Sequence, residues 1–405
     1  MKYLFHIDSN NDLDHLSPVA WKLLETGHEI LYLSTIPSIT SVDYRVRFLS
    51  SFSAFSIVNE GEIFSNRYLR LSIFLRRAHF NRLVRRIIPR KTRVAILCFI
   101  LRTFLRNYLI RESCFDALIY GWSEPERQNF YDARAYGIPN ICLPHGYPCW
   151  TNYDYNSHVK DIRESTGRWP DFSNRNDFDV YVVQTNRHRR LVVDWGQAKQ
   201  KVEAWGNARF SMEWSEINLQ LLDKYQPPHP TDVRQKVLFL LPFNAYAGAS
   251  VDLIELLTGL AEEPSVFLVL KGDTRGGGDS WCRWALDLCS RPNVELCTET
   301  QTPSLVRWAD VVINFATGTA IEALHQGKPL IHATYLTPNV SAFESCQAVH
   351  IAHCKEDVLR ILEEARNGRL ETNPSNLDNY FKDEIYAGKE PFDVLQHYCD
   401  RIILT

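Results

Sequence analysis

The chain has 405 residues, of which 45% are hydrophobic and 23% are charged, and its formal net charge is −3. This composition is typical of a soluble globular enzyme with enough apolar residues for two cores, and the length favours two domains. A net charge so close to zero disfavours a protein that coats nucleic acid, so we expect no nucleic-acid partner. The first residues, MKYLFHID, predict a short β-strand rather than a signal peptide.

Strands and helices alternate through the first half of the chain, as they do in the βαβ units of a parallel sheet. The predicted strands are 2–8, 28–34, 115–121, 138–144, 179–185 and 201–206, and the predicted helices are 15–25, 128–136 and 187–195. Together they predict an N-terminal domain at 1–225.

One segment of this domain, at 63–111, contains thirteen Arg and Lys residues and no Asp or Glu. Its longest apolar run, VAILCFIL, is far shorter than the roughly 20 residues that span a bilayer. A basic, amphipathic, helical insertion of this kind suits an anionic membrane surface or an acidic glycolipid. The alternative is a pair of ordinary helices with solvated arginines that cover the sheet, and both interpretations stay open.

The alternation starts afresh after a proline-rich stretch, QPPHPTD, which predicts a linker at 226–235. The later predicted strands are 236–242, 266–272, 293–298, 311–315, 329–334 and 348–353, and the predicted helices are 250–261, from 281, near 305, 319–326 and 391–403. The fold class is therefore α/β, with two Rossmann-like domains whose parallel sheets face each other across a cleft. The second domain is predicted at 236–390, and a C-terminal helix at 391–405.

The ten cysteines show no CxxC pair and no regular framework. This pattern favours reduced, mostly buried thiols in a cytoplasmic protein, without a structural metal. Four common enzyme classes are also disfavoured, because the sequence has no GxxxxGK[ST] phosphate loop, no GxGxxG after the first strand, no HExxH and no GxSxG.

The stretch INFATGTAIEALHQGKPLI offers a candidate anion site in the second domain. An apolar strand ends at a turn of Thr317, Gly318 and Thr319, and a helix follows with Glu322 in its first turn. Unpaired N–H groups and the helix dipole at such a corner attract phosphate. The alternative is an ordinary corner that binds nothing, since every α/β domain has several.

Two further loops of the second domain follow buried strands. Lys271 and Arg275, within KGDTRGGG, can clamp a diphosphate or a carboxylate, and Asp273 lies between them. The amide of Asn244 could contact a base or a sugar hydroxyl. The alternatives are a mobile surface loop for the first and a simple turn for the second.

In the first domain, His145 and Gly146 directly follow a strand. The imidazole could act as an acid or base or donate to a phosphate oxygen, and the glycine lets the backbone approach a ligand. Asp14 and His15 offer a carboxylate and an imidazole at a predicted helix N-terminus, although Asp14 could simply be an N-cap. Glu124 is a weaker candidate for the same base.

The chain resembles bacterial glycosyltransferases of the two-Rossmann-domain GT-B class that build surface polysaccharides. The resemblance rests on FHIDSNNDLDHLSPVAWKLLETGHEI, LPHGY, VEAWGNARFSMEW, VLKGDTRGGG and WADVVINFATGTAIEALHQGKPLI. The CDP-glycerol glycerophosphotransferases and UDP-GlcNAc 2-epimerase are distant relatives of this class, and the retaining β-Kdo transferases have a similar build. The last motif is the most specific, and it marks the superfamily rather than one substrate.

The resemblance implies a donor-nucleotide site in the second domain and an acceptor site in the first. The turn from Thr317 to Thr319 would meet the phosphates, Glu322 would lie near the ribose, and Lys271 with Arg275 would neutralise the leaving nucleotide in place of a metal. The loops that carry His15 and His145 would face the acceptor.

Two positions depart from the relatives. Asp273 stands where many of them have His in K-G-H-T-R-G. The strand after the linker ends at Asn244, where the β-Kdo transferases place an essential carboxylate, so their mechanism does not transfer to this chain.

These features predict a metal-independent and cofactor-independent glycosyltransferase, with a nucleotide-sugar as its substrate. It would transfer a sugar to a hydroxyl of a lipid-linked surface glycan (capsule, O-antigen or lipopolysaccharide) at the inner face of the bacterial inner membrane. His15 is the predicted base, oriented by Asp14. The alternatives are a CDP-polyol phosphotransferase in which His145 is central, a β-Kdo transferase that uses CMP-Kdo, and a non-catalytic partner in polysaccharide assembly.

Overall fold

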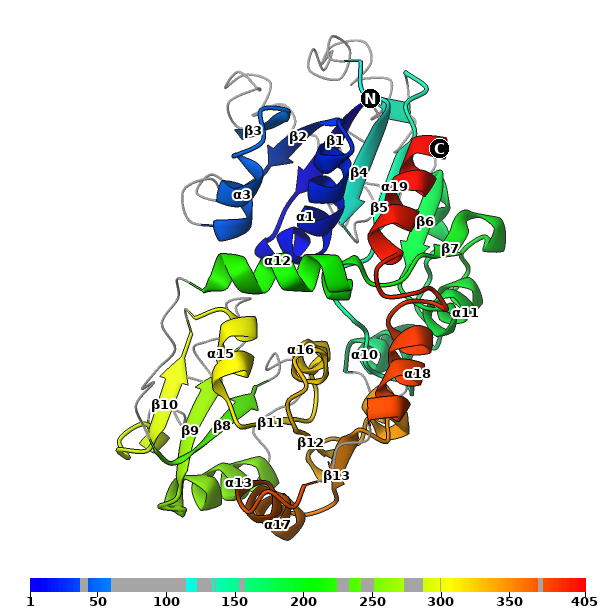
Figure 1. Cartoon of the computed structure of the whole chain (residues 1–405). Coiled ribbons are helices and arrows are strands. Elements are labelled where there is room, and N and C mark those ends of the chain that lie inside the picture. Colours follow the sequence, from blue (N-terminus) through cyan, green and yellow to red (C-terminus); the bar gives the residue numbers. More distant parts are fainter. Residues whose placement is uncertain are drawn as a thin grey trace. The chain divides into compact units, whose positions relative to one another are not determined.

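The computed structural model divides the chain into two compact units (Figure 1). Unit 1 comprises Met1–Gly146, Asp171–Ser211 and Lys389–Thr405, and unit 2 comprises Tyr147–Pro170 and Met212–Gly388. The described residues are 1–36, 43–59, 114–121, 133–134, 136–152, 157–223, 233–241, 251–272, 287–298, 300–370 and 374–405. The basic segment at 63–111 and most of the predicted linker lie outside these ranges.

The chain passes between the units more often than a single linker allows. It leaves unit 1 after Gly146 and after Ser211, and it returns at Asp171 and Lys389. The division therefore differs from the predicted boundaries at 225 and 390, because 147–170 and the helix that follows Ser211 belong to unit 2.

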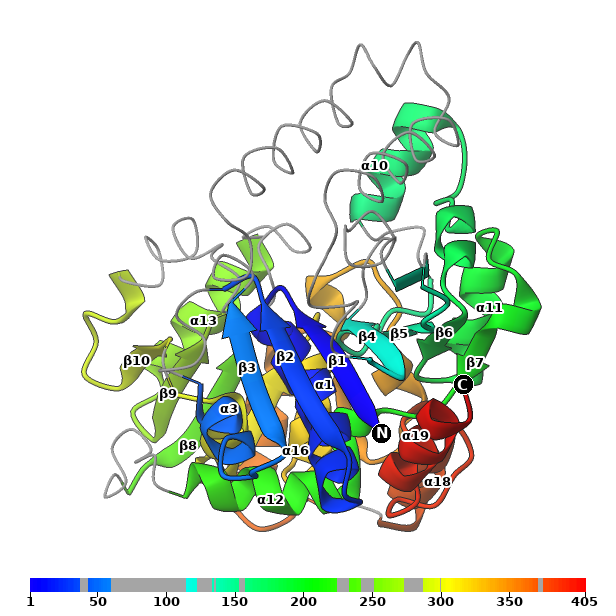
Figure 2. The same cartoon turned by 90° about the horizontal axis from the view of Figure 1, so that it is seen from above.

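Unit 1 contains a parallel sheet of seven strands in the order β3-β2-β1-β4-β5-β6-β7. The strands are β1 (Lys2–Ile7), β2 (Glu29–Ser34), β3 (Phe55–Asn59), β4 (Ala117–Gly121), β5 (Asn140–Leu143), β6 (Val180–Val183) and β7 (Val202–Ala204). Figure 2 shows β3, β2 and β1 side by side. The edge strand β3 was not predicted, and all five of its registered neighbours in β2, from Ile30 to Ser34, are buried, whereas no residue of β3 is.

The central strands of unit 1 are apolar on both faces, because helices cover the sheet on both sides. Every residue of β4 and β5 is buried. Tyr120 of β4 and Phe178 meet edge to face, with ring centroids 5.8 Å apart. Tyr181 of β6 belongs to the same hydrophobic cluster. Burial of each such ring contributes about 1.5–3 kcal/mol to folding, which fixes the sheet whose carboxyl edge carries the site.

The helices of unit 1 are α1 (Asn10–Glu25), α3 (Tyr44–Leu49), α11 (Asn186–Asp194) and α19 (Val394–Leu404), with short 3-10 turns at Ser173–Asp177, Lys199–Lys201 and Ala208–Phe210. Helix α1 packs against α3, α19 and the turn at Ala208–Phe210. It begins five residues before the predicted start at His15, because Ser9 caps it with a capping box that includes Asp12.

Unit 2 contains a parallel sheet of six strands in the order β10-β9-β8-β11-β12-β13. The strands are β8 (Gln235–Leu240), β9 (Val266–Lys271), β10 (Val294–Cys297), β11 (Val311–Asn314), β12 (Leu330–Ala333) and β13 (Val349–Ala352). All six agree with the predicted strands to within two residues at either end. The first described strand of this unit begins at Gln235, so the predicted linker at 226–235 ends where the sheet starts.

The helices of unit 2 are α10 (Ser157–Thr166), α12 (Met212–Leu222), α13 (Val251–Glu262), α15 (Thr302–Trp308), α16 (Ile321–His325), α17 (Lys355–Arg366) and α18 (Pro374–Glu384), and 3-10 turns occur at Gly318–Ala320, Thr334–Leu336 and Ala342–Ser345. Helices α13 and α17 contact each other on one face of the sheet, and α15 and α16 contact each other on the opposite face (Figure 1).

Each sheet has one point where the strand order reverses, between β1 and β4 in unit 1 and between β8 and β11 in unit 2. Loops that leave the carboxyl ends of strands at such a point form the crevice in which α/β proteins bind ligands. In unit 1 the loop after β1 carries Ser9 and leads into the first turn of α1, where Asp12 lies. In unit 2 the loop after β11 carries Thr317. Among the helices of the described ranges, none combines the length and the apolar character needed to cross a membrane.

His332 provides a pH-dependent element in the core of unit 2. It lies in β12 in register with Asn314, it is fully buried, and its ring lies 5.6 Å from that of Phe343. Burial lowers the pKa of His332 from 6.5 to about 4. Between these two values the unfolded chain binds a proton that the folded chain does not, so stability is lost as the pH falls from 6.5 towards 4.

We predict that replacing His332 with Leu reduces the acid sensitivity of unit 2. From pH 7.5 to pH 5.0, His332 should account for a loss of about 2 kcal/mol in the free energy of unfolding. Urea unfolding of the wild type and His332→Leu at both pH values measures this difference. The same loss in both proteins would show that His332 does not carry it.

Candidate functional site

The corner between β1 and α1 holds the most constrained carboxylate of unit 1. Asp12 Oδ2 accepts hydrogen bonds of 2.8 Å from the backbone N–H groups of Asp8 and Ser9. Asp12 is only 5% exposed, although it lies in the first turn of a helix. The positive end of the helix dipole and the two N–H donors stabilise its charge at this depth.

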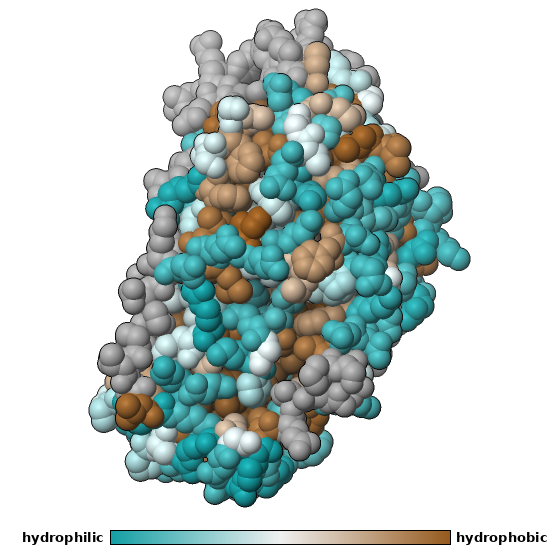
Figure 3. All heavy atoms as spheres, in the orientation of Figure 1, coloured by the Kyte–Doolittle hydropathy of each residue, from teal (hydrophilic) through white to brown (hydrophobic). Residues whose placement is uncertain are grey.

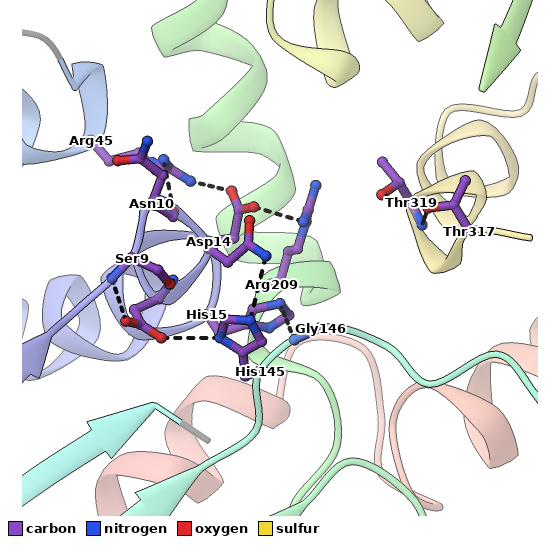
Figure 4. Close-up of polar contacts among 12 residues, drawn as sticks. Ser9, Asn10, Asp14, His15, Arg45, His145, Gly146, Arg209, Thr317 and Thr319 are labelled. Atoms are coloured by element: carbon purple, nitrogen blue, oxygen red, sulfur yellow. Dashed lines mark hydrogen bonds and ion pairs between the residues drawn. The ribbon is translucent and has the colours of Figure 1, made fainter. Parts of the chain in front are cut away.

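The other oxygen of Asp12 faces His145, which follows β5. Asp12 Oδ1 lies 3.0 Å from His145 Nδ1, and His145 Nε2 lies 3.4 Å from the side-chain nitrogen of Asn11 (Figure 4). The carboxylate favours the tautomer with the proton on Nδ1, which leaves a lone pair on Nε2. The His145 side chain is 23% exposed, so a buried carboxylate orients an imidazole that solvent can reach. This is the arrangement of a general base.

Gly121, the last residue of β4, makes room for that carboxylate. A Cβ atom at this position would lie 2.4 Å from Asp12 Oδ1. A side chain at this position would have to displace the Asp12 carboxylate, so the observed arrangement favours glycine here.

His15 supports the backbone of the same site. It is 4% exposed, and its Nε2 accepts a 2.7 Å hydrogen bond from the N–H of Gly146. Gly146 has a φ of +76°, a conformation that favours glycine, and its carbonyl accepts a hydrogen bond from the Gln184 amide. Both contacts hold the turn that presents His145, and Figure 4 shows the one from His15 to Gly146.

Asp14 forms ion pairs with two arginines. Arg45 Nη1 donates to Asp14 Oδ1, and Arg209 Nη1 donates to Asp14 Oδ2 at 2.9 Å (Figure 4). Burial alone would lower the pKa of Arg45, but the carboxylates of Asp14 and Asp43 outweigh it and raise that pKa well above its usual value. The cluster ties α1 to α3 and to the turn that contains Arg209. We predicted that Asp14 orients His15, but the contacts of Asp14 in the structure are with the two arginines, and the carboxylate that contacts His145 is that of Asp12.

The predicted anion corner of unit 2 is an ordered loop after β11. The side-chain oxygen of Asn314 accepts from the N–H groups of Ala316 and Thr317 at 3.3 and 3.0 Å. Thr317 Oγ1 in turn accepts from the N–H of Thr319 at 3.3 Å (Figure 4). The helix predicted from Thr319 begins as a 3-10 turn and continues for only five residues as α16, within which Glu322 is buried.

Gly318 in this loop is required by packing. A Cβ atom on Gly318 would lie 2.3 Å from the carbonyl oxygen of Tyr147, within the same unit. The Tyr147 hydroxyl donates to Glu384 in α18 at 3.1 Å, which holds its segment in place. The glycine therefore lets Tyr147 lie on the loop, a cause that the sequence pattern did not indicate.

Lys271 ends β9 and is almost fully buried, at 5% exposure. Its ammonium group donates to the carbonyl of Thr298 at 2.8 Å, after β10. The remaining predicted site residues, Asn244, Asp273, Arg275 and Glu124, lie outside the described residues. Within the described ranges, no group of three or more His, Cys, Asp and Glu side chains is arranged to hold a metal ion.

Sequence reasoning missed Asp12, Arg45, Arg209 and Tyr147. One local signal was present for Asp12, because Ser9 and Asp12 have the spacing of a capping box. Arg209 and Tyr147 lie within the quoted segments VEAWGNARFSMEW and LPHGY, but their contacts with Asp14 and Glu384, like that of Arg45 with Asp14, are with residues far away along the chain.

No family model matches the sequence, and no curated protein sequence matches it. Solved structures do match it over nearly the whole chain. A UDP-GlcNAc 2-epimerase from Neisseria meningitidis, bound to UDP-GlcNAc, has a TM-score of 0.58 and 13% identity, with full coverage of both chains. Anabaena Alr3699/HepE in complex with UDP and glucose gives the same values.

A glycosyltransferase from Rickettsia africae has a TM-score of 0.55 and 11% identity, and the match covers 99% of this chain and 97% of that one. Likeness at this level of identity defines the fold. The chain has the GT-B fold, with two Rossmann-like units built on parallel sheets of seven and six strands. The predicted α/β fold class, with two Rossmann-like domains built on parallel sheets, is confirmed.

We predict that the buried arginine is needed for the stability of unit 1. Arg45→Met would leave Asp43, whose side chain is 12% exposed, without its arginine and Asp14 with Arg209 alone, at a cost of about 3 kcal/mol, the lower end of the range for breaking a buried pair. Arg307→Met is the matched control, because Arg307 pairs with Asp223 at the surface, where such a pair contributes only about 0–1 kcal/mol. Urea unfolding compares the two variants, and equal losses would contradict the prediction.

Proposed function

We propose that this protein is a glycosyltransferase that moves a sugar from a nucleotide-sugar to a hydroxyl of a lipid-linked surface glycan, without a metal. The observation that carries the proposal is the pair formed by buried Asp12 and accessible His145, at the switch point of a GT-B unit. The GT-B fold is compatible with several reactions, so the argument rests on this pair.

In the proposed reaction, the acceptor hydroxyl replaces Asn11 as the partner of His145 Nε2. The imidazole takes the hydroxyl proton as the oxygen attacks the sugar carbon, and the nucleoside diphosphate leaves with the electron pair of the broken bond. Asp12 stabilises the imidazolium that forms, since its charge is already fixed by two backbone N–H groups. His15 acts as a positioning residue, because it holds the Gly146 turn.

The donor is proposed to bind in unit 2, at the loop after β11. The polar side chains of Thr317 and Thr319 lie at the switch point of that sheet, and Lys271 places a buried positive charge at the carboxyl end of β9. Glu322 and, beyond the described residues, Arg275 and Asn244 belong to the same proposed site. Three matching structures, of two proteins, contain UDP-GlcNAc, UDP and glucose, or UDP-glucose, which supports uridine donors as the first to test.

A second candidate is a nucleotide-sugar 2-epimerase, favoured by the epimerases from Neisseria meningitidis, Listeria monocytogenes and Methanocaldococcus jannaschii among the matching structures. An epimerase would convert its donor with no acceptor and release the epimer. The CDP-polyol and CMP-Kdo alternatives predict a different nucleotide, and a non-catalytic partner predicts no turnover. A panel of UDP-glucose, UDP-GlcNAc, GDP-mannose, CDP-glycerol and CMP-Kdo separates the epimerase, the CDP-polyol transferase, the β-Kdo transferase and the non-catalytic partner from one another.

We predict that turnover of the active donor depends on His145 and Asp12. The His145→Ala variant should lose about 10²- to 10⁴-fold in kcat, the usual contribution of a general base, and Asp12→Asn should lose about tenfold or more. His353→Ala is the control, because His353 lies at the surface of unit 2. Nucleotide release is measured in the presence of EDTA, where the wild type should stay active.

The outcome for His15 separates the two candidate bases. His15→Gln keeps a hydrogen-bond acceptor for the Gly146 N–H, so it should retain most of the activity that His145→Ala loses. Near-wild-type turnover in His145→Ala, together with loss in His15→Gln, would return the role of base to His15.

Lys271→Met should mainly raise the KM for the donor.

We also propose that the basic segment at 63–111 holds the protein at the inner face of the bacterial inner membrane. The support is its sequence alone, with thirteen cationic residues and no acidic one. The full chain should co-sediment with vesicles that contain phosphatidylglycerol and detach as salt is raised. Binding that depends on neither anionic lipid nor salt would contradict this prediction.

A further inference from the structure

A polar pocket lies in unit 1 at the carboxyl ends of β6 and β7, beside α19. It has a volume of about 310 Å³ and is open to solvent. Its lining consists of Asn186, Arg189, Glu203, Ala204, Trp205, Lys389, His397 and Arg401. None of these residues belongs to the cluster around His145. A volume at the lower end of the ligand-pocket range suits a small molecule, or one group of a larger one.

The lining carries more positive than negative charge. Arg189, Lys389 and Arg401 are cationic, and Glu203 is the one carboxylate among the eight residues. Glu203 already accepts hydrogen bonds of 2.9 Å from Trp205 Nε1 and 2.6 Å from Arg401 Nη2. The pocket therefore has an excess of two positive charges when His397 is neutral. Hydrophilic side chains gather over the region of α11 and β7 on the face shown in Figure 3.

Backbone carbonyls of β7 and its flanks hold these cations in place. Lys389 Nζ donates to the carbonyl of Ala204 at 3.2 Å, and Arg189 Nε donates to that of Val202 at 2.9 Å. Arg401 is held by Glu203, but its Nε is buried and has no hydrogen-bond partner among the described residues. The Arg401 side chain as a whole is 40% exposed, so the outer N–H groups of its guanidinium can donate to an anion in the pocket.

The electrostatics of the pocket agree with this geometry. Burial lowers the pKa of Lys389. The pKa of His397 is lowered by burial first and then by the positive charges of Lys389 and Arg401. His397 therefore lies close to two positive groups, and a bound anion would reduce the repulsion among them.

We propose that this pocket binds a phosphate group, as inorganic phosphate or as a phosphate monoester. A phosphate carries a charge of about −1.5 to −2, which matches the excess charge, and its oxygens accept from guanidinium and ammonium donors in several directions. The ligand is either a free phosphorylated metabolite or the phosphate of a lipid-linked molecule, and both share this chemistry. The proposal does not depend on the proposed transfer reaction, and it places a second ligand on unit 1.

Isothermal titration calorimetry of the full chain with inorganic phosphate tests the shared chemistry. Saturable binding should weaken at least about tenfold, equivalent to one charge-assisted hydrogen bond, in Lys389→Met and in Arg401→Gln. Lys201→Met is the matched control, because Lys201 also donates to backbone carbonyls in unit 1, those of Asn176 and Phe178, outside the pocket. Its affinity for phosphate should equal that of the wild type.

Further titrations distinguish the two sources of the phosphate and the proposed donor site. Tighter binding of glucose 1-phosphate than of inorganic phosphate identifies a metabolite, and tighter binding of a short prenyl phosphate identifies a lipid. Saturating UDP should leave the phosphate affinity unchanged. The proposal is overturned if phosphate does not bind, or if acetate binds with the same affinity as phosphate. It is also overturned if Lys201→Met weakens phosphate binding as much as Lys389→Met does. Displacement by UDP with no effect of Lys389→Met would likewise overturn it.

Discussion

The site of unit 1 depends on one carboxylate. Asp12 uses one oxygen to satisfy the N–H groups of Asp8 and Ser9 at the start of α1, and it uses the other to orient His145. Because both oxygens are engaged, the Asp12 carboxylate sets the position of α1 and the orientation of the His145 imidazole. Gly121 is the counterpart in the sheet, since any side chain there would displace the carboxylate. The β1–α1 corner and the candidate base therefore depend on the same carboxylate.

The second carboxylate of α1 has a different task, although it lies only two residues further on. Asp14 joins Arg45 and Arg209, which come from separate parts of unit 1. Burying Arg45 costs free energy that only paired carboxylates can offset, so this cluster fixes how α1, α3 and the Arg209 turn pack together. The two carboxylates of α1 thus have separate partners, since Asp12 contacts His145 and Asp14 contacts the two arginines.

The apolar runs predicted the strands well, because a strand buried on both faces needs no partner information to be recognised. The edge strand β3 was missed, since FSIVN is short and partly exposed. The start of α1 was also missed, and with it Asp12. The polar stretch SNNDLD contains several residues that favour caps, and choosing the later acid moved the helix start to His15. Arg45 and Arg209 could not be predicted, because they reach Asp14 across 31 and 195 residues of chain.

Three glycines of the candidate sites show why a sequence motif does not reveal its own cause. Gly146 is needed for its positive φ, Gly121 for a carboxylate, and Gly318 for the carbonyl of Tyr147. The sequence analysis predicted close approach of the backbone to a ligand at Gly146 and a phosphate at Gly318, and it assigned no role to Gly121. Since Tyr147 already occupies the space beside the Cα atom of Gly318, a donor phosphate in unit 2 would have to be held by the threonine side chains and by Lys271. Side-chain hydroxyls and a buried ammonium group would then do in this protein what a glycine backbone does in a phosphate loop.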